Sequence, residues 1–246
     1  MRRPHTPTMP GAEHRVRAIE RPERLLRTGQ RLTQEQFHAF YEQTPKHFRA
    51  DLINGVVYVS SPLKKRHGRW HARINGLLFL YEEATAGVEA YDNTSLIVDD
   101  SNEPQPDATM CIEPELGGHS AETEDEYMTG SPELVVEVAD SSKRLDLGEK
   151  RIAYREAGVL EYLVVNIPDR KLHLFELKHD RQVHADEDGV LRSSSFPGLW
   201  IDTSHFFDRS GRGCREALNR GLASQEHRRF VSLLANRRKK QKKRSD

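Results

Sequence analysis

Residues 131–139, SPELVVEVA, form the stretch from which both the fold and the site can be worked out. This short apolar run is rich in valine and is entered through a proline, which is typical of a buried β-strand. Glu137 places a carboxylate inside it, and a buried carboxylate is costly unless it is paired or binds a cation. Two roles are therefore open: an ion pair with a lysine or arginine of a packing helix, or a ligand of a functional site.

A second carboxylate, Asp107, stands at the start of another predicted strand, residues 106–112, PDATMCI. On both strands the carboxylate is out of phase with the main apolar set, because successive side chains face opposite sides of a sheet. If the two strands are antiparallel neighbours, Asp107 and Glu137 come within reach of one metal ion. Two carboxylates with open water positions suit Mg²⁺ or Mn²⁺, so the sequence predicts a site for one of these ions.

Such an ion could activate water for attack on a phosphate, and this chemistry also requires a positive charge near the attacking water. A helix is predicted from about residue 143 to residue 157, directly after the polar residues 140–142. Lys150 has the best position on this helix, and Lys143 is the second candidate. The same lysines would serve the structural alternative, in which Glu137 and Lys150 form a buried ion pair without chemistry.

Composition narrows the class of protein. The 246 residues are 36% hydrophobic and 31% charged with a formal net charge of zero, so part of the chain is expected outside the core. Cys111 and Cys214 lie far apart, which argues against a disulfide framework or a zinc ribbon and favours a reducing, cytoplasmic location. No apolar run approaches membrane-spanning length, and no membrane partner is expected.

Three segments are predicted along the chain. Residues 1–28, rich in proline and arginine, are expected to be a disordered or loosely docked arm. Residues 29–208 contain the helix and strand patterns, including a helix that begins at Thr33 and a hairpin turn at Asn54 and Gly55. Residues 209–246 are predicted to be a helical, basic tail.

Two basic stretches are candidates for phosphate contacts, although a solvated surface is the commoner explanation of such runs. The predicted nucleic-acid-binding residues are Lys64, Lys65, Arg66, Arg237, Arg238, Lys239 and Lys240. Close to the first stretch, His67 and His71 lie four residues apart, a metal-ligand spacing on a helix. No third ligand of the zincin type follows them, so a dedicated histidine metal site is not favoured.

In combination, several stretches resemble the Uma-two family of endonucleases, within the PD-(D/E)xK nuclease superfamily. They are LTQEQF, ADLINGVVYVSSP, HGR, PDATM, SPELVVEVADSS, DLGEKRIAYREAGVLEYLVVN and FPGLWIDTSHFF, spread over residues 31–208. The resemblance implies an α/β fold with a restriction-endonuclease-like mixed β-sheet flanked by α-helices. This chain would add an N-terminal helix and hairpins to that core.

The resemblance also assigns roles to individual residues. It implies Asp107 and Glu137 as metal-binding carboxylates and Lys150 as the catalytic lysine. The superfamily pattern puts a lysine two residues after the glutamate, but here that position is Ala139. Asp51 and His67 match further family positions and are expected to join the site.

The resemblance implies an Mg²⁺- or Mn²⁺-dependent endonuclease that hydrolyses DNA phosphodiester bonds. The alternative is a non-catalytic module that binds nucleic acid or another partner and retains the nuclease fold. A module of this kind would be expected to have lost at least one of Asp107, Glu137 and Lys150, all of which are present. A homodimer is left open by the sequence.

Overall fold

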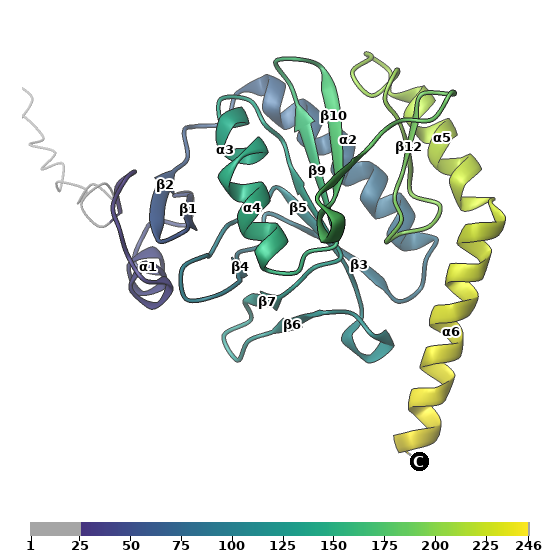
Figure 1. Ribbon diagram of the computed structural model, residues 1–246, viewed down its shortest axis with the longest axis horizontal. Helices are drawn as coiled ribbons and strands as arrows, with labels where there is room; N and C mark the ends of the chain where they lie inside the picture. The colour runs from purple at the N-terminus through teal and green to yellow at the C-terminus, as the bar shows by residue number, and fades with distance from the viewer. Residues whose placement is uncertain (1–25, 246) are drawn as a thin grey trace, which may run out of the picture.

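The structure is a computed structural model that describes residues 26–245 (Figure 1). Of the predicted N-terminal arm, residues 1–25 therefore lie outside the described part of the chain. No helix of the described residues is long and apolar enough to cross a membrane.

The centre of the fold is a six-stranded mixed sheet. Its spatial order is β11 (Arg181–Val183), β10 (Lys171–Glu176), β9 (Glu161–Asn166), β8 (Leu134–Glu137), β5 (Ala108–Ile112) and β3 (Val88–Asp92). Strands β8 and β9 are parallel, and every other neighbouring pair is antiparallel. The predicted strand 131–139 thus becomes β8, a buried inner strand with a partner on each side.

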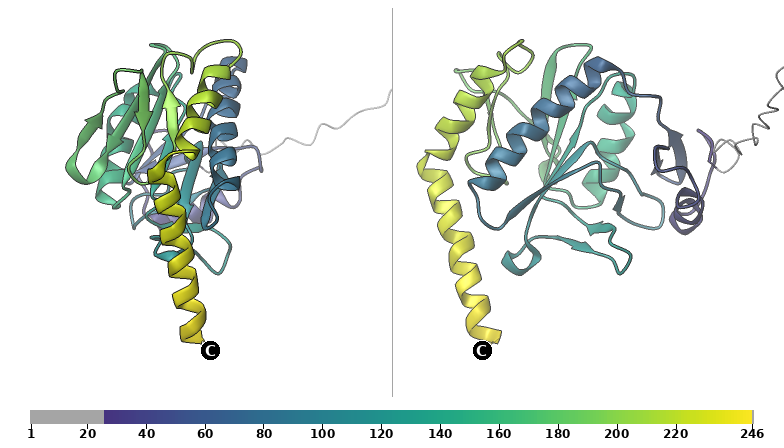
Figure 2. Two further views of the ribbon diagram at one scale, coloured as in Figure 1. Left: turned by 90° about the vertical axis from the view of Figure 1, so that its right-hand side faces the viewer. Right: turned by 180° about the vertical axis from the view of Figure 1, so that it is seen from behind.

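Helices cover both faces of this sheet, as Figures 1 and 2 show. On one face, α2 (Lys65–Glu83) packs with α5 (Arg212–Leu222) over apolar side chains of the strands, such as Met110 and Val136. On the other face lie α3 (Lys143–Leu147) and α4 (Glu149–Glu156), and Tyr154 of α4 packs there with Val135. The predicted α/β fold with a mixed sheet flanked by helices is confirmed.

The predicted strand faces are also confirmed. Ala108, Met110 and Ile112 belong to the core under α2 and α5, whereas Cys111 belongs to the core under α3 and α4. Val135 and Ala139, which share a face with Glu137, lie on that second side too. Glu137 therefore points to the side of the sheet that α3 and α4 cover, where Lys150 of α4 contacts it.

An N-terminal unit lies beside α3 and α4 at the left of Figure 1. It contains α1 (Gln34–Tyr41), which begins with a capping box at Thr33, and the hairpin of β1 (Ala50–Ile53) and β2 (Val56–Val59). Asn54 and Gly55 at the turn have φ of 51° and 69°, the left-handed values that the Asn-Gly pair predicts. This unit encloses its own small core and closes one end of the sheet.

The predicted helix over 143–157 is divided into two by Gly148. Its φ of −111° and ψ of −100° are not helical, so α3 ends and α4 restarts in a new direction. A Cβ at this position would lie 2.8 Å from the carbonyl oxygen of Arg144, and this close approach requires glycine. The break turns one face of α4, including Lys150, toward the end of β8.

The remaining elements surround this core. They are β4 (Leu96–Ile97), β6 (Ser120–Glu122) and β7 (Met128–Gly130) in a small sheet, β12 (Val190–Arg192) paired with β13 (Trp200–Asp202), the short 3₁₀ helices η2 (Pro114–Leu116) and η3 (Leu177–His179), and α6 (Gln225–Ser245). Helix α6 packs against the core in its first half and against η2 in its second half, and its end extends beyond the sheet (Figures 1 and 2). Leu218 of α5 and Phe230 and Leu234 of α6 belong to the main core, so the basic C-terminal segment is joined to the folded unit.

Candidate functional site

A cavity of about 650 Å³ lies where the N-terminal hairpin meets the ends of β8 and α2 and the start of α4. Among its lining residues are six of those predicted from the sequence: Asp51, Lys64, His67, Asp107, Glu137 and Lys150. They come from five separate stretches of the chain, which the fold brings to one place. The geometry of this cavity is therefore the basis on which a function can be argued.

The pairing of β5 with β8 places the first two carboxylates. The strands are antiparallel, with Ala108 opposite Val136, so the next pair outward is Asp107 and Glu137. Asp107 lies just before β5, and its Oδ2 accepts a hydrogen bond of 2.7 Å from the backbone N–H of Val138. This bond fixes Asp107 against the end of β8 and leaves Oδ1 on the cavity side near His67.

Lys150 reaches the same point from α4. Its Nζ lies 2.8 Å from Oδ2 of Asp51 and 2.9 Å from Oε1 of Glu137. A third carboxylate, that of Asp146, is 4.0 Å away. Asp51 is held in place at its other oxygen, Oδ1, by the backbone N–H of Gln105 at 2.7 Å. The hairpin, the sheet and α4 are thus joined through one lysine.

Glu137 receives a second donor from α4. The hydroxyl of Tyr154 donates to Oε1 at 2.9 Å, the same oxygen that Lys150 contacts. Lys150 and Tyr154 are four residues apart, so they project from one face of the helix. Oε2 of Glu137 accepts no hydrogen bond from any residue that the structure describes. One oxygen of Glu137 is therefore fixed by protein donors, and the other is available to a ligand.

The charges in the cavity do not balance. Burial raises the pKa of Glu137 well above its usual value, Lys150 opposes this, and the carboxylates of Asp146, Asp107 and Asp51 reinforce it. Burial alone would lower the pKa of Lys150, but the three carboxylates around it raise that pKa well above its ordinary value. Six carboxylates and four lysine or arginine side chains line the cavity, and Lys150 lies among the buried carboxylates of Asp51, Glu137 and Asp146. The excess negative charge favours the entry of a cation.

Asp107 has a different environment from that of Glu137. Burial opposes its ionisation, but contacts with His67 and the Val138 N–H outweigh burial and lower the pKa of Asp107. Nε2 of His67 lies 3.5 Å from Oδ1 of Asp107, and Nε2 of His71 lies 3.0 Å from the backbone oxygen of the same residue. Burial lowers the pKa of His67, and Asp107 more than compensates, so that pKa is raised overall. Asp107 is thus held as a carboxylate.

Two lining or supporting residues were not singled out as site residues by the sequence argument. Asp146 is buried. Its Oδ2 accepts from Ser142 Oγ at 2.5 Å, and its Oδ1, 4.0 Å from Lys150 Nζ, has no hydrogen-bond partner among the described residues. Tyr154 is the other, as the donor to Glu137. Their only sequence signal is the spacing: Asp146, Lys150 and Tyr154 follow one another at intervals of four.

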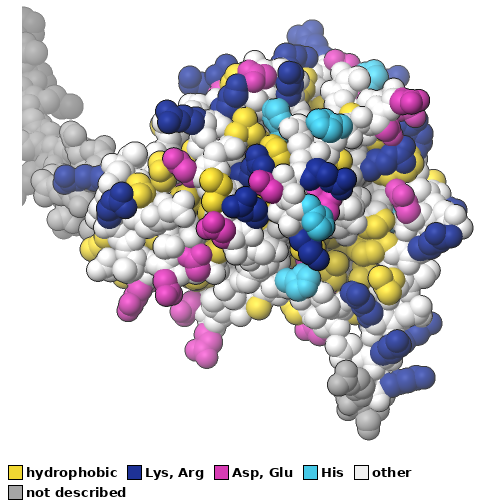
Figure 3. Space-filling view, in the orientation of Figure 1, with side chains coloured by type: hydrophobic (Ala, Val, Ile, Leu, Met, Phe, Trp, Pro, Cys, Tyr) yellow, Lys and Arg dark blue, Asp and Glu magenta, His cyan; other side chains and the backbone are white. Residues whose placement is uncertain are grey.

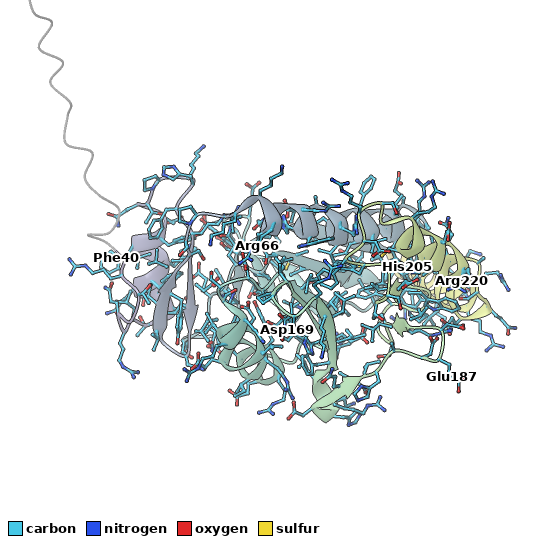
Figure 4. All side chains as sticks on the ribbon, turned by 90° about the horizontal axis from the view of Figure 1, so that it is seen from above. Phe40, Arg66, Asp169, Glu187, His205 and Arg220 are labelled. Atoms are coloured by element: carbon cyan, nitrogen blue, oxygen red, sulfur yellow. The ribbon has the colours of Figure 1, made fainter. Side chains whose placement is uncertain are left out.

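The other predicted residues lie outside the cavity. Lys143, the second lysine candidate, is paired with Asp169 at 2.6 Å on the surface. Arg66, labelled in Figure 4, forms an exposed ion pair with Asp140 at the start of α2. The predicted tail residues stand on α6, at the opposite side of the molecule from the hairpin (Figure 1). Two of them are engaged there: Arg238 pairs with Glu113, and Arg237 donates to the backbone oxygen of Leu116.

The donor chemistry of the cavity fits a hard divalent cation. Asp107 and Glu137 each keep a carboxylate oxygen without a backbone donor, and the unpartnered Oδ1 of Asp146 lies in the same cavity. Within residues 26–245, no group of three or more His, Cys, Asp or Glu side chains is arranged to hold a metal ion. Two carboxylates are nevertheless enough for Mg²⁺, which keeps several of its water ligands when it binds.

Comparisons with known proteins agree with this fold. Residues 34–204 match the sequence profile of the Uma2 family, described as "Putative restriction endonuclease". The structure is similar to the crystal structure of "a putative nuclease belonging to DUF820" from Anabaena variabilis ATCC 29413. The similarity has a TM-score of 0.56 at 10% sequence identity, over 72% of this chain and 97% of the other. No curated protein sequence matches the chain.

Proposed function

Because the chain belongs to the Uma2 family of restriction-endonuclease-like proteins, we propose that it is an endonuclease that hydrolyses DNA phosphodiester bonds with the help of a divalent metal ion. The observation that carries the proposal is the meeting of Asp107 and Glu137, from adjacent strands, with Lys150 in one cavity. A cytoplasmic location and a homodimer stay predictions.

Each residue has a distinct task in this proposal. Asp107 and Glu137 would hold Mg²⁺ or Mn²⁺ through their free oxygens. When bound, the ion supplies Lewis-acid activation of water and neutralises negative charge on the phosphate. Lys150 orients Glu137 and stabilises the negative charge that develops on the phosphate oxygens. Asp51 anchors Lys150 to the hairpin, and His67 maintains Asp107 as a carboxylate.

A comparison of two lysines tests the proposal. Purified wild type, Asp107→Asn, Lys150→Met and Lys143→Met would be incubated with single- and double-stranded DNA in Mg²⁺ or Mn²⁺, and the cleavage rate measured. Wild type and Lys143→Met are expected to cut at similar rates, because Lys143 forms an exposed pair outside the cavity. Asp107→Asn and Lys150→Met are expected to lose on the order of a hundred-fold or more.

The outcomes separate the candidate functions. Cutting that survives both Asp107→Asn and Lys150→Met would mean that the site is wrong. A wild type that binds DNA but cuts it with neither metal would be the non-catalytic module retaining the nuclease fold. Thermal unfolding of each variant would show whether a loss of cutting reflects a loss of folded protein.

A further inference from the structure

A group of five arginines surrounds the loop of residues 206–209, outside the cavity. We call these residues, Arg69, Arg73, Arg170, Arg209 and Arg212, the arginine cluster. Four of them are exposed, and Arg73 is half-buried. The cluster lies where α2 and α5 run side by side, which the right-hand view of Figure 2 shows. No function described above uses it.

Backbone carbonyl groups hold the cluster together. Arg73 donates to the oxygens of Phe206 and Asp208 at 2.5 and 2.6 Å. Arg69 donates to the oxygen of Arg209 at 2.9 Å. From the opposite side, Nη2 of Arg170 donates at 3.0 Å to the oxygen of Phe207, which follows Phe206 in the loop. Three guanidinium groups from α2 and from the β9–β10 turn thus converge on four consecutive residues.

Aromatic rings orient the same guanidinium groups. Arg69 and Arg73 stack on Trp70, with distances of 5.0 and 5.1 Å to the ring centroid, and Arg170 lies 5.4 Å from the Phe207 ring. The glycine at position 211 has a φ of +65°, and a Cβ there would lie 2.8 Å from the Arg73 guanidinium. These contacts restrict the rotamers of long side chains, which lowers the entropy cost of binding a ligand.

The cluster is not neutralised by carboxylates. Within the described part of the chain, none of its five members lies within 4.0 Å of a carboxylate oxygen, whereas surface arginines elsewhere, such as Arg192 with Asp186, do. Burial lowers the pKa of Arg73, and Arg69 also lowers it, although Cys214 and the carboxylate of Asp208 act in the opposite direction. Gathering positive charge without counter-charge costs free energy, so the arrangement indicates an anionic partner.

The position of the cluster connects it with the cavity. Arg66, Arg69 and Arg73 occur at helical spacing along α2, whose first residues border the cavity through Lys64 and His67. Arg66 and Arg73 are seven residues apart, a rise of about 10 Å, which corresponds to about three phosphates of one DNA strand. Seen from above in Figure 4, α2 runs from Arg66 toward His205, next to the 206–209 loop. Figure 3 shows Lys and Arg side chains, with some Asp and Glu among them, along the upper edge of the molecule.

We propose that the arginine cluster binds the phosphate backbone of duplex DNA beside the bond that is cut in the cavity. The inference rests on the proposed function, which supplies the path of the DNA. Guanidinium groups fit phosphate oxygens because they present two parallel N–H donors. The side chains of Arg209 and Arg212 are exposed and do not hold the loop in place. Their contacts with DNA phosphates add binding affinity and take no part in the cleavage reaction.

Binding of a fluorescein-labelled DNA duplex, followed by anisotropy in EDTA, tests this proposal without cleavage. The test variant is Arg209→Gln/Arg212→Gln. The matched control is Arg220→Gln/Arg229→Gln, which removes the same charge from exposed arginines of α5 and α6. The test variant is expected to weaken binding by a factor of about 10 to 100 and to reduce the salt dependence of log K by about 2, one per lost phosphate contact. The control is expected to bind like wild type.

The outcomes for the cluster and for the nuclease are separable. Equal weakening in the two double variants, or no binding of the duplex by wild type, would overturn the role of the cluster. Cutting by a wild type whose binding does not depend on the cluster would leave the nuclease proposal intact. Cluster-dependent binding without cutting would support phosphate binding by the cluster and overturn the nuclease proposal. Arg209→Lys/Arg212→Lys, which keeps the charge, is expected to restore the salt dependence.

Discussion

One buried glutamate, Glu133, directly precedes β8, and another, Glu137, is its last residue. Their carboxylate oxygens have different hydrogen-bond partners. Glu133, 1% exposed, accepts hydrogen bonds at both oxygens: Oε2 from the N–H of Ile112 at 2.8 Å, and Oε1 from the N–H of His119 at 3.0 Å. Glu137, 4% exposed, has its donors on Oε1 alone, and both come from side chains, Lys150 and Tyr154. Both glutamates are buried, but both oxygens of Glu133 accept hydrogen bonds from the described residues, whereas only one oxygen of Glu137 does.

The difference shows how a structural carboxylate can be told from a functional one. At Glu133, backbone N–H groups saturate the carboxylate, and its contribution is to connect β5 and the following segment with β8. At Glu137, one oxygen accepts no donor from residues 26–245 and lies in a cavity where carboxylates outnumber lysine and arginine side chains by six to four. Glu137 is the candidate metal ligand because one of its oxygens accepts no hydrogen bond from the described part of the chain and the cavity has an excess of negative charge, not because it is buried.

The largest expected effect is on catalysis at the cavity end. Glu137→Gln should lower the cleavage rate by a factor on the order of a thousand, because a metal-binding oxygen is lost. The free energy of unfolding should change little, because Lys150 retains its ion pair with Asp51 and the repulsion between the carboxylates of the cavity is reduced. Single-turnover cleavage and urea unfolding measure the two quantities. A variant that cuts like wild type would contradict the assignment of Glu137.

Glu133→Gln should produce the reverse pattern. The NH₂ group of glutamine cannot accept a hydrogen bond, so one of the two backbone N–H groups that Glu133 satisfies would lose its acceptor. The free energy of unfolding should therefore fall by about 2 kcal/mol. The cleavage rate per folded molecule should stay at the wild-type value, because Glu133 is outside the cavity. Urea unfolding and active-fraction-corrected cleavage check this result. Loss of cutting in a fully folded Glu133→Gln would remove the distinction between the two ends of β8.

Asp146 gives a pH-dependent test of the excess charge. Burial raises the pKa of Asp146 to about 6, against the influence of Lys150. An acid with a raised pKa stabilises the folded state below its unfolded pKa, and this contribution is lost as pH rises through the folded pKa. Asp146→Asn should therefore be more stable than wild type at pH 8, by about 2 kcal/mol, and the gain should vanish toward pH 4. A gain independent of pH, measured by urea unfolding, would contradict the charge argument.

The smallest expected effect distinguishes two neighbouring tyrosines. Tyr154 and Tyr162 are both fully buried, with ring centroids 5.1 Å apart, but only Tyr154 donates to Glu137. Tyr154→Phe should weaken Mn²⁺ binding about 10-fold by calorimetry, because the orientation of Glu137 is lost. Tyr162→Phe removes a hydrogen bond to the backbone oxygen of Asp146 and should leave the affinity near wild type. Equal affinities of the two variants would show that the Tyr154 hydroxyl is only structural.

The sequence predicted strand β8 and the alternation of its side chains between the two faces of the sheet. It also singled out Asp107, Glu137 and Lys150 as a group. These predictions were possible because strand alternation and helix spacing are local properties of the sequence. It did not reveal the division of the helix at Gly148, since a single glycine does not specify the direction in which the chain continues. Nor did it reveal that Arg238 pairs with Glu113, because a run of charges looks uniform until its partners are placed. Contacts between residues that are distant in the sequence could be identified only from the three-dimensional structure.

The ion pairs of Lys150 affect the stability of the fold around the cavity. Its ammonium group lies within 3 Å of Asp51 and Glu137, so the chain carries a resident counter-ion for its own acidic cavity. The carboxylates of Asp51 and Glu137 therefore have a positive partner in the chain itself, which offsets part of the cost of burying them without a metal ion. A metal ion bound as proposed would add stability that grows with the logarithm of the free ion concentration once that concentration exceeds the dissociation constant.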